Sequence, residues 1–452
     1  MAQDTHEAGQ PGRGGAARQV APAEPAAACE PGRPARPWLG RRRLMASYAV
    51  FAAYAVLFAI FSRGEDQVWA IWASCGYAAA LFMLRLWPAR TAAVLVSVAV
   101  AVIAPLLWLS VAYPLEAGMM VIDRSATLLL HHGSPYLTSQ QVTSWLSYNP
   151  YLTVMTLFGM PSALGLGGLA GNSGVWLAVV TVALLAAAFW AAVAHRGCAT
   201  CRRDALLATA VAVASPVIGL NLAVITTDPP VLALILLSMA LAARPSSRIA
   251  GVIGSGAALG VACDLKSTAW LAVPVMAAMF ARRDGARAAV RFVAASLVTA
   301  VVLIVALAPA VLIRPAALTA LVQNSVLFPL GLTHYKTPAE SLLPGHLLAD
   351  MGTAGHVLSV GLLLAAGLAI IVSLLIRPPR DVPAAARRLA LGLTLIFLLG
   401  PAVRFGYFIY PLGLLGWLAL TREGGGLTAA DLPLDLGRLV WQQARGRVLA
   451  CA

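Results

Sequence analysis

The chain has 452 residues, of which 60% are apolar and only 11% are charged. A water-soluble domain cannot bury that much apolar surface in one core, so the composition predicts a polytopic membrane protein. The formal net charge of +14 would favour nucleic acid in a soluble protein, but the arginines fall mainly in predicted cytoplasmic segments, where they set topology. We therefore expect an all-α transmembrane bundle in contact with the lipid bilayer, and no nucleic-acid partner.

The two ends of the chain differ from its middle. Residues 1–44 are rich in Pro, Ala, Gly and Arg without an apolar period, which is typical of a disordered tail, here a cytoplasmic one. The apolar run 46–61 is not followed by a small-residue cleavage pattern, so we interpret it as an uncleaved first span. Residues 423–452 are expected to form a second cytoplasmic tail, which leaves 45–422 as the transmembrane domain.

Apolar stretches predict about twelve crossings of the plasma membrane, with both termini in the cytoplasm. Several of them are shorter than the roughly 20 residues that a straight span needs. This threading keeps the arginine clusters inside and places most other polar motifs outside, so the functional face is expected to be extracytoplasmic. The expected spans are 46–61, 68–84, 91–112, 174–194, 205–225, 229–243, 249–263, 268–281, 292–313, 355–376, 389–403 and 406–420.

Two long outer loops, 113–173 and 314–354, separate these spans. Within the first, the glycine-broken apolar segment 152–170 is expected to be interfacial or re-entrant, because a crossing there would place an arginine cluster outside. Aromatic rings in such loops can stack on a sugar, and a carboxylate can act as general base toward an acceptor hydroxyl. The residues leave open whether Asp123 or Glu116 takes that role.

The stretch 249–281 has arginine near both ends, which requires an even number of crossings, yet it is too short for two full spans. The chain must therefore turn back near Asp264 and Lys266. Short, interrupted helices line cavities, and ionisable residues there are a candidate functional site. The alternative is that the two side chains only cap the turn and bond each other. Asp228 precedes two prolines on the same side of the membrane and is a further candidate site residue. The alternative is that it only caps the following helix.

Only two lysines occur, Lys266 and Lys336, and both fall in predicted outer loops. An ammonium suits phosphate oxygens as a point charge, and Arg404 at the outer end of a span could add a bidentate contact. The alternative is that the placement of two lysines is chance.

The cysteines and acids indicate no metal or redox chemistry. The six cysteines are scattered, which predicts no disulfide framework, and Cys198 and Cys201 lack the second pair of ligands that a zinc site needs. The sequence also contains no Asp-x-Asp motif, so we expect neither metal nor cofactor.

The order of these motifs resembles a known family. A span, an Asp, the Gly-Ser-Pro-Tyr element at 133–136, the Tyr-Asn-Pro turn at 148–150 and a Gly/Pro-broken apolar helix resemble the glycosyltransferase C superfamily. Within it, the chain from about 91 to 420 resembles glycosyltransferase family 87, the polyprenyl-phosphate-mannose-dependent α-mannosyltransferases of actinobacterial envelopes. The turn departs from the family's more frequent Tyr-Pro-Pro.

The resemblance implies a lipid-linked donor used outside the cytoplasm, and transfer of a sugar, expected to be mannose, to an envelope lipid or glycan with inversion at the sugar carbon. Asp123 matches the family's acidic general base, and Lys266, Arg404 or Lys336 would hold the donor phosphate. We expect Asp123, Asp228 or Asp264, Lys266 and Arg404 to line one cavity. The candidate pocket residues are Tyr136, Tyr148, Asn149, Asp228, Asp264, His334 and Tyr335.

Two other classes compete with the enzyme. About twelve spans with a broken hairpin and an ion pair also fit a secondary transporter or lipid flippase, although the chain shows no internal repeat of the kind such carriers contain. A non-catalytic subunit of envelope assembly is the third hypothesis, and it gains if Asp123 lies far from the cationic residues.

Overall fold

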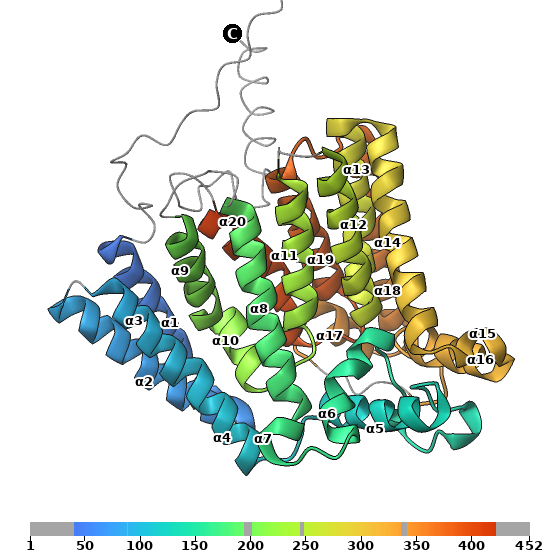
Figure 1. Ribbon diagram of the computed structural model, residues 1–452, viewed down its shortest axis with the longest axis horizontal. Coiled ribbons are helices and arrows are strands. Elements are labelled where there is room, and N and C mark those ends of the chain that lie inside the picture. The colour runs from blue at the N-terminus through green and yellow to red at the C-terminus, as the bar shows by residue number, and fades with distance from the viewer. Residues whose placement is uncertain (1–39, 88, 194–200, 245–247, 336–340, 422–452) are drawn as a thin grey trace, which may run out of the picture. The chain divides into compact units, whose positions relative to one another are not determined.

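The computed structural model describes residues 40–87, 89–193, 201–244, 248–335 and 341–421, all within the compact unit Ala35–Ala452. Every secondary-structure element in these residues is a helix (Figure 1). The predicted all-α fold is therefore confirmed for the described part of the chain. Most of the tail 1–44, the whole of 423–452, Lys336 and Cys198 lie outside the described residues, and the first helix begins at Arg41.

Within the described residues, seven helices are long and apolar enough to cross a membrane, which suggests a transmembrane protein. Each corresponds to one of the expected spans. The third of them contains a π-helical turn, η2 (Ala99–Ile103), whose Ala101 carbonyl accepts a hydrogen bond from the Trp69 indole. The seven are α1 (Arg41–Phe61), α2 (Gly64–Leu86), α3 to α4 (Arg90–Ala112), α8 (Ser173–Val193), α14 (Ala286–Leu307), α18 (Thr353–Ile376) and α19 (Val382–Leu399).

The expected number of about twelve spans is too high, although all twelve expected segments are helical. The segment 205–225 forms two helices, α9 (Cys201–Ala214) and α10 (Pro216–Ala223), bent by 68° where Pro216 interrupts the helix. Counting this pair as one span gives at most eight. Four further segments form helices of only 13 to 18 residues: α11 (Pro229–Ala242), α12 (Arg248–Leu265), α13 (Ala272–Asp284) and α20 (Ile409–Thr421).

These short helices form the interior of the bundle. At a rise of about 1.5 Å per residue, a helix of 14 residues is about 20 Å long, less than the roughly 30 Å of a hydrocarbon core. Twelve of the fourteen residues of α11 are buried, because α8, α12 and α20 pack around it. Gly256 and Gly260 let α12 approach α14 closely, since a Cβ there would lie 2.6 Å and 2.5 Å from carbonyl oxygens of α14.

The first outer loop is folded into helices, as expected, and its 152–170 segment is not a span. Its main helix, α5 (Ala117–His132), runs across the direction of the long helices at their lower ends (Figure 1). It packs on the 3₁₀ helix η5 (Thr153–Gly159), which is followed by α6 (Met160–Ala163) and α7 (Gly168–Gly171).

The second outer loop is less regular. It begins after the short helix α15 (Ala310–Ile313) with α16 (Pro315–Val322), which continues into the π-helical turn η8 (Gln323–Leu327). The helix α17 (Pro344–Asp350) follows before α18. Figure 1 places α15 and α16 beyond the lower end of α14, on the side of the molecule where α5 lies.

Candidate functional site

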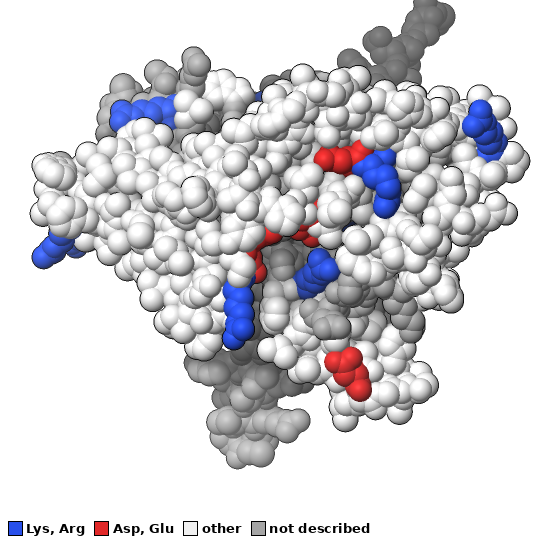
Figure 2. Space-filling view, turned by 90° about the horizontal axis from the view of Figure 1, so that it is seen from below, with Lys and Arg blue, Asp and Glu red and all other residues white. Residues whose placement is uncertain are grey.

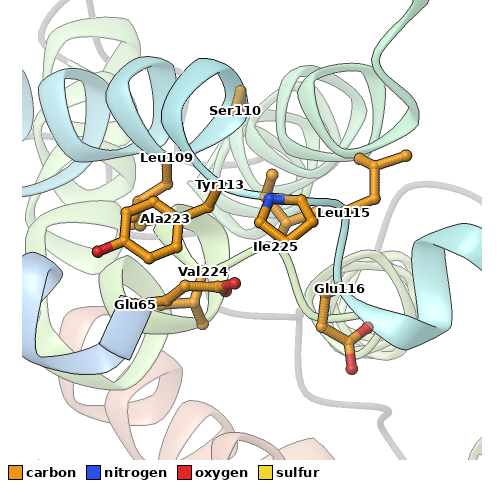
Figure 3. A pocket seen from close by; sticks show the side chains of 10 residues that line it. Glu65, Leu109, Ser110, Tyr113, Leu115, Glu116, Ala223, Val224 and Ile225 are labelled. Atoms are coloured by element: carbon orange, nitrogen blue, oxygen red, sulfur yellow. The ribbon is translucent and has the colours of Figure 1, made fainter. Parts of the chain in front are cut away.

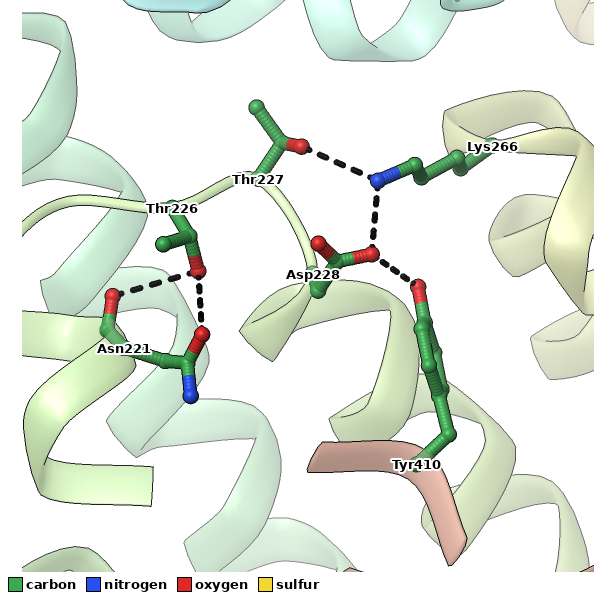
Figure 4. A network of polar contacts seen from close by, with 6 residues as sticks. All are labelled: Asn221, Thr226, Thr227, Asp228, Lys266 and Tyr410. Carbon is green, nitrogen blue, oxygen red and sulfur yellow. Dashed lines mark hydrogen bonds and ion pairs between the residues drawn. The ribbon is translucent and has the colours of Figure 1, made fainter. Parts of the chain in front are cut away.

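The short helices end at one buried polar cluster. Asp228 immediately precedes α11, Lys266 immediately follows α12, and Tyr410 lies in the first turn of α20. The Lys266 ammonium lies 2.6 Å from Oδ1 of Asp228 and 3.3 Å from the Thr227 hydroxyl, and the Tyr410 hydroxyl donates to the same Oδ1 at 2.6 Å (Figure 4). The side chains of Lys266 and Asp228 are only 12% and 7% exposed. We call Thr227, Asp228, Lys266 and Tyr410 the Lys266 centre.

Local sequence explains why the Asp228 carboxylate is available to this centre. Pro229 and Pro230 occupy the first helical positions of α11, where backbone N–H groups would have lacked intrahelical partners. Asp228 stands at the N-cap position, but its side chain makes no capping hydrogen bond. The capping role considered for Asp228 is therefore not observed, and the carboxylate is paired with Lys266 and Tyr410 instead.

Two tyrosine rings surround the ammonium. The Lys266 nitrogen lies 4.8 Å from the ring centre of Tyr407 and 5.9 Å from that of Tyr151, both within cation–π range. Burial acts to lower the pKa of Lys266, but the Asp228 charge and the neighbouring tyrosines outweigh it, and the pKa is raised. Pairing with Asp228 thus favours the charged form of Lys266 in spite of its burial.

The beginning of α5 brings a second carboxylate to the same place. Oε2 of Glu116 accepts a hydrogen bond from the Gly118 amide at 2.6 Å. A Cβ on Gly118 would lie 2.7 Å from that oxygen, 2.8 Å from the Tyr151 hydroxyl and 3.4 Å from Cγ2 of Thr227. Burial raises the pKa of Tyr151 to about 12, with Lys266 acting in the opposite direction, so its phenol stays neutral. Glu116 and Lys266 thus approach Tyr151 from its hydroxyl and its ring.

A small pocket adjoins Glu116. It is lined by Glu65 from α2, Tyr113, Glu116 and the chain between α10 and α11, including Ile225 (Figure 3). Ile225 has φ 58°, the only positive φ of a non-glycine residue in the described ranges, and the cost of such a conformation is about 1–3 kcal/mol. Its side chain contacts Gly174 of α8, where no Cβ would fit. This contact holds the segment that leads into Thr227 and Asp228.

Asp264 and Lys266 have different bonding partners, although only Leu265 separates them in the chain. It is fully buried, and its Oδ2 accepts hydrogen bonds from the Thr153 hydroxyl at 2.7 Å and the Val154 amide at 3.0 Å. Lys266 pairs with Asp228 instead, so the considered bond between Asp264 and Lys266 is wrong. Asp264 ties the end of α12 to η5.

Three of the expected pocket residues form the interior of the outer loops. The Tyr136 hydroxyl donates to the Tyr151 carbonyl at 3.1 Å. The backbone N–H of Asn149 donates to the Asn324 side chain at 2.8 Å, and the side-chain carboxamide of Asn149 donates to the Ser125 hydroxyl. The Tyr148 ring stacks on Phe328 with centroids 4.5 Å apart. The Asn149–Asn324 hydrogen bond and the Tyr148–Phe328 stack join the first outer loop to the second, and the other two contacts lie within the first.

Asp123 lies on α5 seven residues after Glu116, about 10 Å further along a helix. It is half-buried beside Gly159, and its Oδ1 is buried without a hydrogen-bond partner among the described residues. Burial raises the pKa of Asp123, while the neighbouring Ser173 hydroxyl lowers it. Asp123 therefore stands at the contact of α5, η5 and α8.

Arg404 lies close in sequence to Tyr410, one of the four residues of the Lys266 centre. It is exposed, and its carbonyl accepts a hydrogen bond from the Tyr407 amide at the start of the 3₁₀ helix η9 (Phe405–Phe408). His334 and Tyr335 line a groove together with Tyr148. Seen from below in Figure 2, acidic side chains border a hollow near the middle of the face, with Lys and Arg side chains nearby.

No role was predicted from the sequence for Tyr407 and Tyr410, and Glu116 was considered only as a second base. Tyr407 and Tyr410 stand three residues apart at the start of the last apolar run, directly after Arg404. That position at an expected outer membrane boundary was the available signal. Within the described ranges, no group of three His, Cys, Asp or Glu residues could hold a metal ion.

Comparison with known proteins adds no relative. No protein-family model, no curated protein and no solved structure matches the chain.

Proposed function

We propose that this protein is a membrane glycosyltransferase that moves a sugar, mannose in the first instance, from a polyprenyl-phosphate donor to an envelope lipid or glycan on the extracytoplasmic side. The observation that carries the proposal is the buried Lys266 facing the Tyr151 ring, with the Tyr151 hydroxyl and the Glu116 carboxylate both next to Gly118. An ammonium has three N–H donors, and Asp228 and Thr227 accept two. The third can reach an oxygen of a donor phosphate.

The reaction follows from these groups. The acceptor hydroxyl attacks the anomeric carbon and gives its proton to a carboxylate, while the bond between that carbon and the phosphate oxygen breaks. Its electron pair leaves with the polyprenyl phosphate, whose added negative charge Lys266 stabilises, with Arg404 as a second cation. Because the leaving group is already a phosphate, the step needs no metal.

Two carboxylates are candidates for the base. Asp123 is the match to the acid of the resembled family, and its raised pKa would make it a stronger base than an ordinary aspartate. Glu116 has the advantage of position, because its carboxylate and the Tyr151 hydroxyl both lie next to Gly118, and the Tyr151 ring faces Lys266. The two are separated by about two turns of α5, so one acceptor hydroxyl cannot contact both.

A secondary transporter or lipid flippase is the second candidate function. It is favoured by the 68° break between α9 and α10 and by short helices that meet at a buried ion pair, features found at the substrate sites of carriers. A carrier would move the intact lipid-linked sugar, whereas the enzyme breaks its glycosidic bond. The two activities can be measured on the same preparation.

The test uses full-length protein in liposomes with radiolabelled polyprenyl-phosphate mannose and extracted envelope lipids and glycans as acceptors. The enzyme predicts label in the acceptor fraction, and a loss of about 10²-fold or more in either Glu116→Gln or Asp123→Asn, whichever is the base. Asp350→Asn is the matched control, because that carboxylate is 63% exposed and lies 3.0 Å from Nδ1 of His346. Movement of intact donor across the liposome without transfer would contradict the enzyme and support the carrier.

A further inference from the structure

A groove of about 390 Å³ lies between the two outer loops, within the roughly 300–1,000 Å³ usual for ligand sites. We propose that this groove binds a short oligosaccharide of hexoses, which rests on the proposed function because that glycan would be the acceptor. The residues that carry the argument are Ser139 and Tyr148 from the first loop and Gln323, Thr333, His334 and Tyr335 from the second.

The two walls of the groove are fixed to each other by buried hydrogen bonds. Asn324 is fully buried, and its carboxamide donates to the Leu137 carbonyl at 3.1 Å and accepts from the Asn149 amide at 2.8 Å. The Ser325 hydroxyl donates to the Tyr151 carbonyl at 3.3 Å. A ligand therefore meets a preformed groove and loses less binding free energy to ordering of the protein.

The chemistry of the groove fits a sugar. The Tyr148 ring is held by stacking on Phe328 at an interplanar angle of 12°, and the rings of His334 and Tyr335 stand edge to face at 4.8 Å. Aromatic rings can pack on the apolar C–H faces of a hexose, while the hydroxyl and amide groups of Ser139, Gln323 and Thr333 can exchange hydrogen bonds with sugar hydroxyls.

The described lining of the groove offers hydrogen bonds and ring faces. Among the described residues that line it, none is Asp, Glu, Lys or Arg. Hydroxyl, amide and aromatic groups of this kind suit the hydroxyls and C–H faces of a sugar.

One short segment connects the groove to that centre. Tyr148 lines the groove, and Tyr151, three residues later, faces Lys266. Between them, Asn149 is 2% exposed and fixed by three hydrogen bonds, one of them to the Tyr151 amide. Three extended residues span about 10 Å. A glycan in the groove could thus place a terminal hydroxyl near the charged centre while its other units stay on aromatic walls.

The experiment measures binding of α-linked mannotriose to the full-length protein in detergent by saturation-transfer NMR. We expect mannotriose to bind, and Gln323→Ala and His334→Ala each to lower its affinity about tenfold, equivalent to about 1.4 kcal/mol. Tyr148→Phe keeps the stacked ring and should retain binding. His356→Ala, an exposed histidine on α18, is the matched control.

Absence of mannotriose binding, or binding by the Gln323→Ala and His334→Ala variants equal to that of the wild type, would overturn the proposal. These results are distinguishable from failure of the proposed function. Sugar transfer in liposomes without mannotriose binding would leave the enzyme standing and remove the groove. Binding that depends on Gln323 and His334 without any transfer would leave the groove and remove the enzyme.

Discussion

Two buried aspartates at the ends of neighbouring helices are used in different ways. Asp228, before α11, shares one oxygen between the Lys266 ammonium and the Tyr410 hydroxyl. Asp264, at the end of α12, has no cationic partner among the described residues and accepts two hydrogen bonds from the outer loop. The difference shows that burial of an acid does not define its role. Its partners define the role: Asp228 belongs to the charged Lys266 centre, whereas Asp264 fixes the neighbouring outer loop to α12.

Removing one charge of the Lys266 centre should give the largest effect. Lys266→Met leaves Asp228 buried without its cation, and loss of one partner of a buried pair costs about 3–5 kcal/mol in the free energy of unfolding. The double variant Lys266→Met/Asp228→Leu removes both charges, so we expect it to recover most of that stability but no sugar transfer. Thermal unfolding and transfer are measured on the same detergent preparations.

Asp264→Asn is the matched control for that experiment. Its carboxamide oxygen can still accept from Thr153 and Val154, so the expected loss is at most about 1 kcal/mol. If Asp264→Asn destabilised the protein as much as Lys266→Met does, the contrast between the two aspartates would fail. A double variant that regained both stability and transfer would show that the ion pair is only structural.

A single methyl group tests whether the site depends on the fit between α5 and the Lys266 centre. In Gly118→Ala the new Cβ would lie 2.7 Å from the Glu116 oxygen and 2.8 Å from the Tyr151 hydroxyl, so both side chains must shift. We expect transfer to fall about tenfold, equal to about 1.4 kcal/mol in the barrier, while the fold survives. Gly361→Ala on α18 has open space around its Cβ and is the control. Equal transfer rates in the two variants would exclude this dependence.

The smallest expected effect is the pH dependence at Asp123. Burial raises the pKa of this carboxyl in the folded state, so the folded protein holds the proton more tightly than the unfolded chain. Stability is therefore lost as pH rises from the usual aspartate pKa through the raised value. Asp123→Asn cannot ionise, and we expect its Tm to exceed that of the wild type by at most about 2 °C at pH 7.5, with no difference at strongly acid pH. A lower Tm for the variant at pH 7.5 would contradict this.

The sequence located the helices well and their membrane crossings poorly. Each expected apolar segment is a helix, because apolar content and glycine or proline breaks are local properties. Whether a 14-residue helix such as α11 crosses alone or is enclosed by its neighbours depends on packing, which periodicity does not report. The fold class was therefore predictable, and the span count was not.

The site was predictable one residue at a time. Asp228, Lys266 and Tyr148 were all named from their positions, but their partners were not, because a pairing across 38 residues depends on helix rotation and on where each helix ends. Asp264 was the nearer acid in sequence and the wrong partner. Tyr410 was missed because a tyrosine within an apolar run is also typical of a membrane boundary.

The hydrogen bonds of the Lys266 centre join residues that are separated by very different distances along the sequence. Lys266 and Asp228 are 38 positions apart, whereas Tyr410 and Asp228 are 182 apart. During synthesis the acid and the ammonium emerge within one helical hairpin of each other and can neutralise each other early, before most of the later helices exist. The Tyr410 hydroxyl arrives only with the last helix, after the entropy of the long intervening loop has been overcome. We therefore expect the centre to be completed in two stages of biogenesis, with the Tyr410 hydrogen bond forming only when the last helix has reached its place.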